Sequence, residues 1–223
     1  KRMRNLEVAE IVDQVALIDK QSKLYFDRPL SNIVFMGMGE PMMNYKNVVD
    51  AIKKITEEDG LGMSARRITV STSGIPKMMR MLADENLKVK LALSLHSAIE
   101  HKRNEIMPFS TKFPLTEIME AMQYWYDKTG SRITFEYCVW KGINDGDEDI
   151  KALIKYCKQV PCKVNLIQYN PIGEGKFDHR SVEAEEKYVR ELEKAGITAL
   201  VRRSRGGDID AACGQLANKN SVE

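Results

Sequence analysis

The chain has 223 residues and a mass of 25.4 kDa, enough for one domain with a sizeable core or at most two small ones. Hydrophobic residues make up 43% of the sequence and charged residues 30%, which is typical of a globular protein and excludes a disordered chain. The 34 Lys and Arg residues nearly balance the 32 Asp and Glu residues, so the formal charge of +2 excludes a histone-like polycation but not a local basic patch.

Patterns typical of helices and strands alternate along the whole chain. Apolar residues at helical spacing predict a first helix over residues 7–19, and the apolar run at 32–36 predicts the first strand. A long connection containing Pro108 and Pro114 follows the third strand. The other predicted strands are 67–72, 89–95, 133–139, 163–168 and 197–202, and the other predicted helices are 44–56, 76–83, one from Leu115, one ending near Cys157 and one from Ser181 to Gly196.

This alternation predicts βα units on a parallel sheet that is either open or closed into a barrel. Function in such folds gathers at the carboxyl ends of the strands. Glycine and polar residues cluster at these ends, at 37–44, 71–74, 94–97, at Asn170 and at 202–208. We therefore expect the site to lie at this edge of the sheet.

The four cysteines fit neither a zinc site, nor a redox pair, nor an iron–sulfur pattern. Their scatter favours reduced thiols in a cytoplasmic protein, and no apolar run or signal peptide argues for a membrane or secreted protein. Cys138, Cys157 and Cys162 are expected in the core. For Cys213, which lies among small and polar residues, structural and reactive roles remain about equally favoured.

Several strand-end residues are candidates for ligand binding, each with a structural alternative. Gly37–Pro41 brings a carboxylate and free carbonyls close to a ligand and suits an ammonium group, although this motif taken alone favours a simple tight turn. The hydroxyl of Ser71 either contacts a ligand or caps a turn. His96 is the one histidine at a strand end, where a structural role is the more common one. Arg202, Arg203 and Arg205 form either a solvated edge or a contact for RNA phosphates.

The order of these motifs strongly resembles the RlmN/Cfr family of radical S-adenosylmethionine (SAM) adenosine methyltransferases, and is closer to its RlmN branch. The resemblance covers nearly the whole chain. The motifs that carry it are Arg4-Asn5-Leu6, Gly37-Met38-Gly39-Glu40-Pro41, Ser71-Thr72-Ser73-Gly74, Ser94-Leu95-His96, Glu136-Tyr137, Asn144-Asp145, Asn170-Pro171 and Asp208-Ile209-Asp210-Ala211-Ala212-Cys213-Gly214-Gln215.

The resemblance implies a partial (β/α)6 barrel that binds SAM and a [4Fe–4S] cluster and methylates adenine C2 in large-subunit ribosomal RNA, and in transfer RNA as well. It also implies that Cys213 is the catalytic methyl carrier, whose sulfur is methylated by one SAM before a radical derived from a second SAM attacks that methyl group. C2 is favoured over C8 only by the resemblance. The implied SAM-binding residues are Gly39, Glu40, Ser71, Ser94, Leu95, His96 and Asn170.

The chain departs from the family pattern because the C-x3-C-x2-C cluster motif, expected just upstream of Arg4-Asn5-Leu6, is not present. We therefore expect residues 1–223 to be a fragment, a radical SAM core lacking the cluster loop, the first barrel strand and the N-terminal RNA-binding domain. No metal ligand is assigned within it. As given, we expect a monomer that binds SAM weakly and is catalytically inactive, with an exposed strand edge.

Two other functions are weighed against this one. The first alternative is a non-catalytic RNA-binding module that uses Arg202–Arg205. This alternative predicts salt-dependent RNA binding that SAM does not affect. The second alternative is a cluster-free α/β-barrel enzyme that acts on a small phosphorylated substrate. Gly206 and Gly207 are the glycines available to bind its phosphate.

Overall fold

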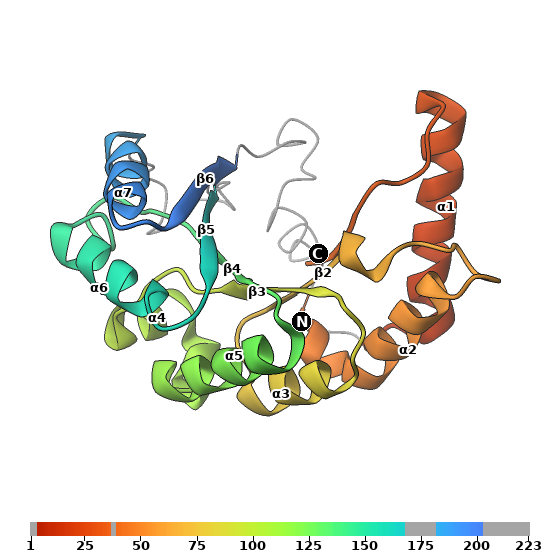
Figure 1. The fold of residues 1–223 in the computed structure, drawn as a ribbon, viewed down its shortest axis with the longest axis horizontal. Coiled ribbons are helices and arrows are strands. Elements are labelled where there is room, and N and C mark those ends of the chain that lie inside the picture. Colours follow the sequence, from red (N-terminus) through yellow and green to blue (C-terminus); the bar gives the residue numbers. More distant parts are fainter. Residues whose placement is uncertain (1–3, 37–38, 168–181, 203–223) are drawn as a thin grey trace, which may run out of the picture.

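The fold is described from a computed structural model that covers residues 4–36, 39–167 and 182–202 (Figure 1). Within these ranges no helix is both long and apolar enough to cross a membrane. The helices and strands are α1 (Val8–Phe26), β1 (Ile33–Phe35), α2 (Tyr45–Thr56), β2 (Ile68–Thr72), α3 (Pro76–Asp84), β3 (Lys90–Ser94), α4 (Glu100–Ile106), α5 (Leu115–Thr129), β4 (Ile133–Tyr137), α6 (Asp147–Cys157), β5 (Cys162–Ile167), α7 (Val182–Lys194) and β6 (Thr198–Arg202).

The six strands form one parallel sheet in which each strand pairs with the next along the chain, in the order β1 to β6. The sheet curves into an open arc, and the helices that connect its strands cover the convex side (Figure 1). The predicted partial barrel is therefore confirmed, with all six predicted strands present. Helices on one side are the expected result of right-handed crossovers between parallel strands.

The convex side of the sheet carries the hydrophobic core. Alternate residues of the central strands, such as Val70, Leu93, Phe135 and Val164, are fully buried there against the helices. The helices contribute apolar stripes at the spacing of a helical turn, as in α5. Cys157 belongs to this core and Cys138 is buried, so the predicted positions of these two thiols are confirmed.

The concave side of the sheet carries polar residues on its central strands and apolar residues, such as Val34 and Leu200, on its outer strands. Residues that alternate with the core residues lie on it in rows across neighbouring strands, because parallel register places paired residues on the same face. One row runs from Ser94 through Glu136 to Asn165, by the pairing of β3 with β4 and of β4 with β5. The concave side is therefore the one equipped to bind a polar ligand.

Two predicted elements differ in the structure. Helix α1 extends to Phe26, and Ile18, which was expected to face inward, is 48% exposed. The second half of α1 projects beyond α2, so no helix among the described residues covers its apolar face (Figure 1). The long connection after β3 contains a helix, α4, which is too short at seven residues to give a clear periodic signal.

Candidate functional site

Six of the predicted SAM-binding residues lie at or near the carboxyl ends of three adjacent strands, which meet at one edge of a parallel sheet. Gly39 and Glu40 follow β1, Ser71 lies in the second half of β2, and Ser94 ends β3 just before Leu95 and His96. The pairing of β1 with β2 and of β2 with β3 makes these segments neighbours. Asn170 and Cys213 lie outside the described residues.

The loop after β1 is held by the carboxylate of Glu40. Its Oε1 accepts a hydrogen bond from the Met42 N–H at 3.1 Å, while its Oε2 accepts from the N–H and the hydroxyl of Ser73 at 2.7 and 2.6 Å. An ionised carboxylate has about four acceptor sites, so these three bonds leave one for a ligand. Gly39 has φ +100° and open space where a side chain would project, so a ligand can approach the backbone closely. This loop fits the ammonium group expected from the sequence.

Replacing Glu40 by alanine should lower the free energy of unfolding by about 2 to 3 kcal/mol, because three partly buried hydrogen bonds are lost. Ser73→Ala is the matched control, since it removes one of the three bonds and should cost about 1 kcal/mol. Urea denaturation of both variants measures the difference. A Ser73→Ala loss as large as that of Glu40→Ala would contradict the view that the Glu40 carboxylate joins the two loops.

The other serines of the site lie on the concave face. Ser71 is buried and pairs in register with Ala92, and Ser94 is half-buried and pairs with Glu136. The side chain of Leu95 belongs instead to the hydrophobic core and is fully buried. Leu95 can therefore reach a ligand only through its main chain.

His96 is held in one orientation and one charge state. Its Nδ1 accepts a hydrogen bond from the Cys138 N–H at 3.1 Å, and its main-chain N–H donates to the Glu136 carbonyl at 3.4 Å. Burial, with a contribution from the charge of Arg103, lowers the pKa of His96 to about 4. The neutral ring therefore carries its proton on Nε2, which has no acceptor in the described part of the chain and is free to donate to a ligand.

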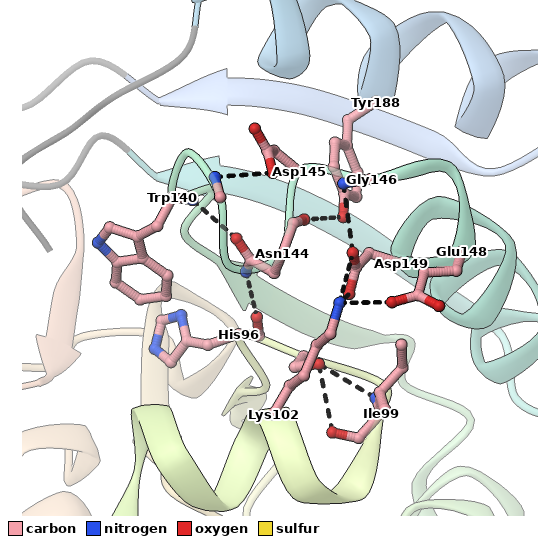
Figure 2. Close-up of polar contacts among 12 residues, drawn as sticks. His96, Ile99, Lys102, Trp140, Asn144, Asp145, Gly146, Glu148, Asp149 and Tyr188 are labelled. Carbon is pink, nitrogen blue, oxygen red and sulfur yellow. Dashed lines mark hydrogen bonds and ion pairs between the residues drawn. The ribbon is translucent and has the colours of Figure 1, made fainter. Parts of the chain in front are cut away.

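Asn144 fixes the backbone around His96 (Figure 2). Its Nδ2 donates to the carbonyls of His96 and Cys138 at 2.7 and 2.8 Å, and its Oδ1 accepts from the Trp140 N–H at 2.7 Å. The hydroxyl of Tyr188 donates to the Asn144 carbonyl at 2.5 Å. Asn144 is completely buried, and it ties the segments after β3 and β4 to α7. His96 has φ 56°, a conformation that costs energy in a residue other than glycine and that these bonds maintain.

A second connection beside Asn144 joins α4 to the start of α6 (Figure 2). Lys102 donates to both carboxylate oxygens of Asp149 at 2.9 Å and to Glu148 at 2.7 Å. Asp149 is buried and also accepts from the Gly146 N–H at 3.2 Å. This ion pair holds α4, and hence the segment that follows His96, against the rest of the domain.

Glu136 is a buried carboxylate on the concave face that residue patterns alone did not single out. It is 2% exposed, and its Oε1 accepts from the Asn165 amide at 2.9 Å and lies 3.7 Å from Arg202 Nη1. Its Oε2 is buried and has no hydrogen-bond partner in the described residues. Burial raises the pKa of Glu136. The sequence signal that could have revealed Glu136 is an acidic residue within the apolar run at 133–139. The pairing of Glu136 with Ser94 places it beside the predicted site.

The described cysteines do not form an iron–sulfur centre. A cluster needs thiolates that converge, and no three His, Cys, Asp or Glu side chains in the described ranges are grouped to hold a metal ion. Of the predicted basic cluster, Arg202 is exposed at the end of β6, while Arg203 and Arg205 lie outside the described residues.

The chain is similar in sequence to known proteins along most of its length. The model of the radical SAM superfamily matches residues 2–157. Over 219 residues the chain is 66% identical to a probable dual-specificity RNA methyltransferase RlmN of Flavobacterium psychrophilum, covering 98% of this chain and 63% of that protein. It is 46% identical over 217 residues to the protein of the same description in Salinibacter ruber, covering 96% of this chain and 59% of that protein.

Solved structures agree with these matches. The crystal structure of a radical SAM methyltransferase from Sphaerobacter thermophilus superposes with a TM-score of 0.92 at 41% identity, covering 96% of this chain and 62% of that one. A domain of a pyruvate-formate lyase-activating enzyme from Bacteroides vulgatus shares the fold, with a TM-score of 0.60 at 16% identity, covering 78% of this chain and 99% of that one. The chain spans about three fifths of the length of the curated relatives it matches.

Proposed function

The chain belongs to the radical SAM superfamily, and from this premise we propose that it forms the core of an RNA methyltransferase of the RlmN type. The observation that carries the proposal is the match over 98% of the chain, at 66% identity, to a protein described as an RlmN RNA methyltransferase. The polar groups at the ends of β1, β2 and β3 lie at the one edge where a parallel α/β fold binds its ligand, which supports the same function.

Membership of the superfamily implies SAM as a cofactor, and the described residues fit it. Glu40 retains an acceptor site for the amino group, Gly39 leaves its backbone open, and His96 presents an Nε2–H that has no acceptor in the described ranges. The Oε2 of Glu136, which has no hydrogen-bond partner among the described residues, is a further acceptor beside Ser94. When bound, SAM supplies the methyl group. The implied [4Fe–4S] cluster does not fit the described residues, so no step of the reaction is derived through it.

The proposed substrate is adenine C2 in large-subunit ribosomal RNA, and in transfer RNA as well. Cys213 is the proposed methyl carrier and Asn170 a further SAM contact, both by resemblance to the family. The arginines at 202, 203 and 205 are proposed to contact RNA phosphates. The proposal takes residues 1–223 as one radical SAM core domain, acting as a monomer in the cytoplasm, where these RNAs are found.

The experiment that tests the proposal uses the protein encoded by the longest reading frame that contains this chain, purified anaerobically. Transfer of radiolabelled methyl groups from SAM to ribosomal RNA is measured, and C2-methyladenosine is identified by mass spectrometry. Cys213→Ala should abolish transfer, because it removes the sulfur that carries the methyl group, while Cys157→Ala should transfer normally because Cys157 lies in the hydrophobic core. Methyl transfer by Cys213→Ala would overturn the role of Cys213, and salt-dependent RNA binding without methylation would favour a non-catalytic RNA-binding module.

A further inference from the structure

Arg103 is a buried cation at the centre of the strand-end loops. It lies on α4 and is completely buried. Its Nη2 donates to the Ser73 carbonyl at 2.6 Å and, more weakly, to the Ser94 carbonyl at 3.4 Å. Its Nε and Nη1 have no hydrogen-bond partner in the described residues. One side chain thus contacts the main chain at the carboxyl ends of both β2 and β3.

This arrangement is energetically costly for the fold alone. A buried charge normally has an opposite charge beside it, and removing a cation from water without one costs several kcal/mol. No carboxylate in the described ranges lies within ion-pair distance of Arg103. Glu100 acts on it electrostatically without a direct bond, and burial lowers the pKa of the guanidinium, although an arginine remains charged at neutral pH. Among the described residues, the guanidinium of Arg103 donates hydrogen bonds only to the neutral carbonyls of Ser73 and Ser94.

The two carbonyls belong to segments that form the proposed SAM site. Ser73 donates both its N–H and its hydroxyl to Glu40, so a shift of Ser73 would move the Glu40 carboxylate. Ser94 is two residues before His96 and is itself a predicted SAM contact. The charge of Arg103 also reaches His96, where it adds to the effect of burial in keeping the ring neutral.

We propose that Arg103 is a positioning residue for the SAM site, which holds Ser73 and Ser94 in place and so sets the direction of the Glu40 carboxylate. This inference rests on the proposed function, because it assumes that Glu40 and Ser94 face SAM. The planar guanidinium suits the task, since the N–H groups of Nη2 are held in one plane and are shared between the Ser73 and Ser94 carbonyls. A lysine ammonium at this position keeps the charge, but its N–H donors rotate and are not held in one plane.

The test uses the protein encoded by the longest reading frame that contains this chain, and compares its Arg103→Met and Arg103→Lys variants with the unmodified protein. SAM affinity is measured by calorimetry, and the pKa of His96 by NMR titration, with its signal assigned from His96→Asn. Arg103→Met should weaken SAM binding about tenfold or more and raise the pKa of His96. Arg103→Lys should weaken binding similarly but leave the pKa of His96 low, because its charge is kept.

Arg80→Met is the matched control, because Arg80 lies on α3 with its side chain partly exposed over Tyr124 and near Glu120. It should change neither readout. Circular dichroism shows whether each variant folds. If Arg103→Met does not fold, the SAM affinity of Arg103→Lys decides whether Arg103 positions the site. SAM binding at unmodified strength by a folded Arg103 variant would overturn this inference alone. Failure of the unmodified full-length protein to bind SAM would overturn the proposed SAM site, and this inference with it.

Discussion

Replacing Asn144 by alanine should lower the free energy of unfolding by about 4 kcal/mol, because it removes two buried and one partly buried side-chain hydrogen bond at once. The bonds join Trp140, Cys138 and His96, so the loss is shared by the segments after β3 and β4. Urea denaturation followed by tryptophan fluorescence measures the change. The effect is large because Asn144 is completely buried and water cannot replace its amide.

The neighbouring residue provides the control for this prediction. Asp145 accepts one hydrogen bond, from the Gly142 N–H at 2.9 Å in an exposed part of the turn. Asp145→Ala should therefore cost about 1 kcal/mol or less. If Asn144→Ala cost no more than Asp145→Ala, Asn144 would not be the residue that fixes the backbone around His96.

Acidification should destabilise the protein through His96, by up to about 3 kcal/mol between pH 6.5 and about 4. The pKa of His96 is lowered in the folded state, by burial first and by the charge of Arg103 second. The unfolded chain binds a proton at His96 from about pH 6.5 downward, whereas the folded state does so only near pH 4. The contribution is therefore fully present above pH 6.5 and is lost as the pH falls towards 4. Protonation would also remove the acceptor of the Cys138 N–H.

The measurement is the free energy of unfolding from urea denaturation at several pH values for the unmodified chain and for His96→Asn. Asparagine tolerates a positive φ and offers an oxygen near the position of Nδ1, so this variant should fold and show a smaller loss of stability over the window. His101→Asn is the control, because His101 is exposed on the same helix as Arg103. Equal pH dependence in the unmodified chain and in His96→Asn would show that other groups govern acid stability.

The motifs at the strand ends could be located from the sequence because they depend on local order along the chain. A run such as 67–72 followed by Ser73 and Gly74 fixes a strand and its end, and parallel topology then gathers the ends at one edge. All six strands and the strand-end positions of Glu40, Ser71, Ser94 and His96 follow in this way, whereas their predicted role as SAM contacts comes from the family resemblance. The fold class and the family were confirmed by the structure and by the comparisons.

What each of these residues contacts was decided only by the tertiary structure. The bond between Glu40 and Ser73 spans 33 residues, and that between Asn144 and the His96 carbonyl spans 48, so no spacing in the sequence reveals either. Arg103 was missed for the same reason, because a buried arginine on a short helix has the same sequence signal as an exposed one. Periodicity determines which face of an element is apolar, but the partner of a buried polar group depends on how distant elements pack.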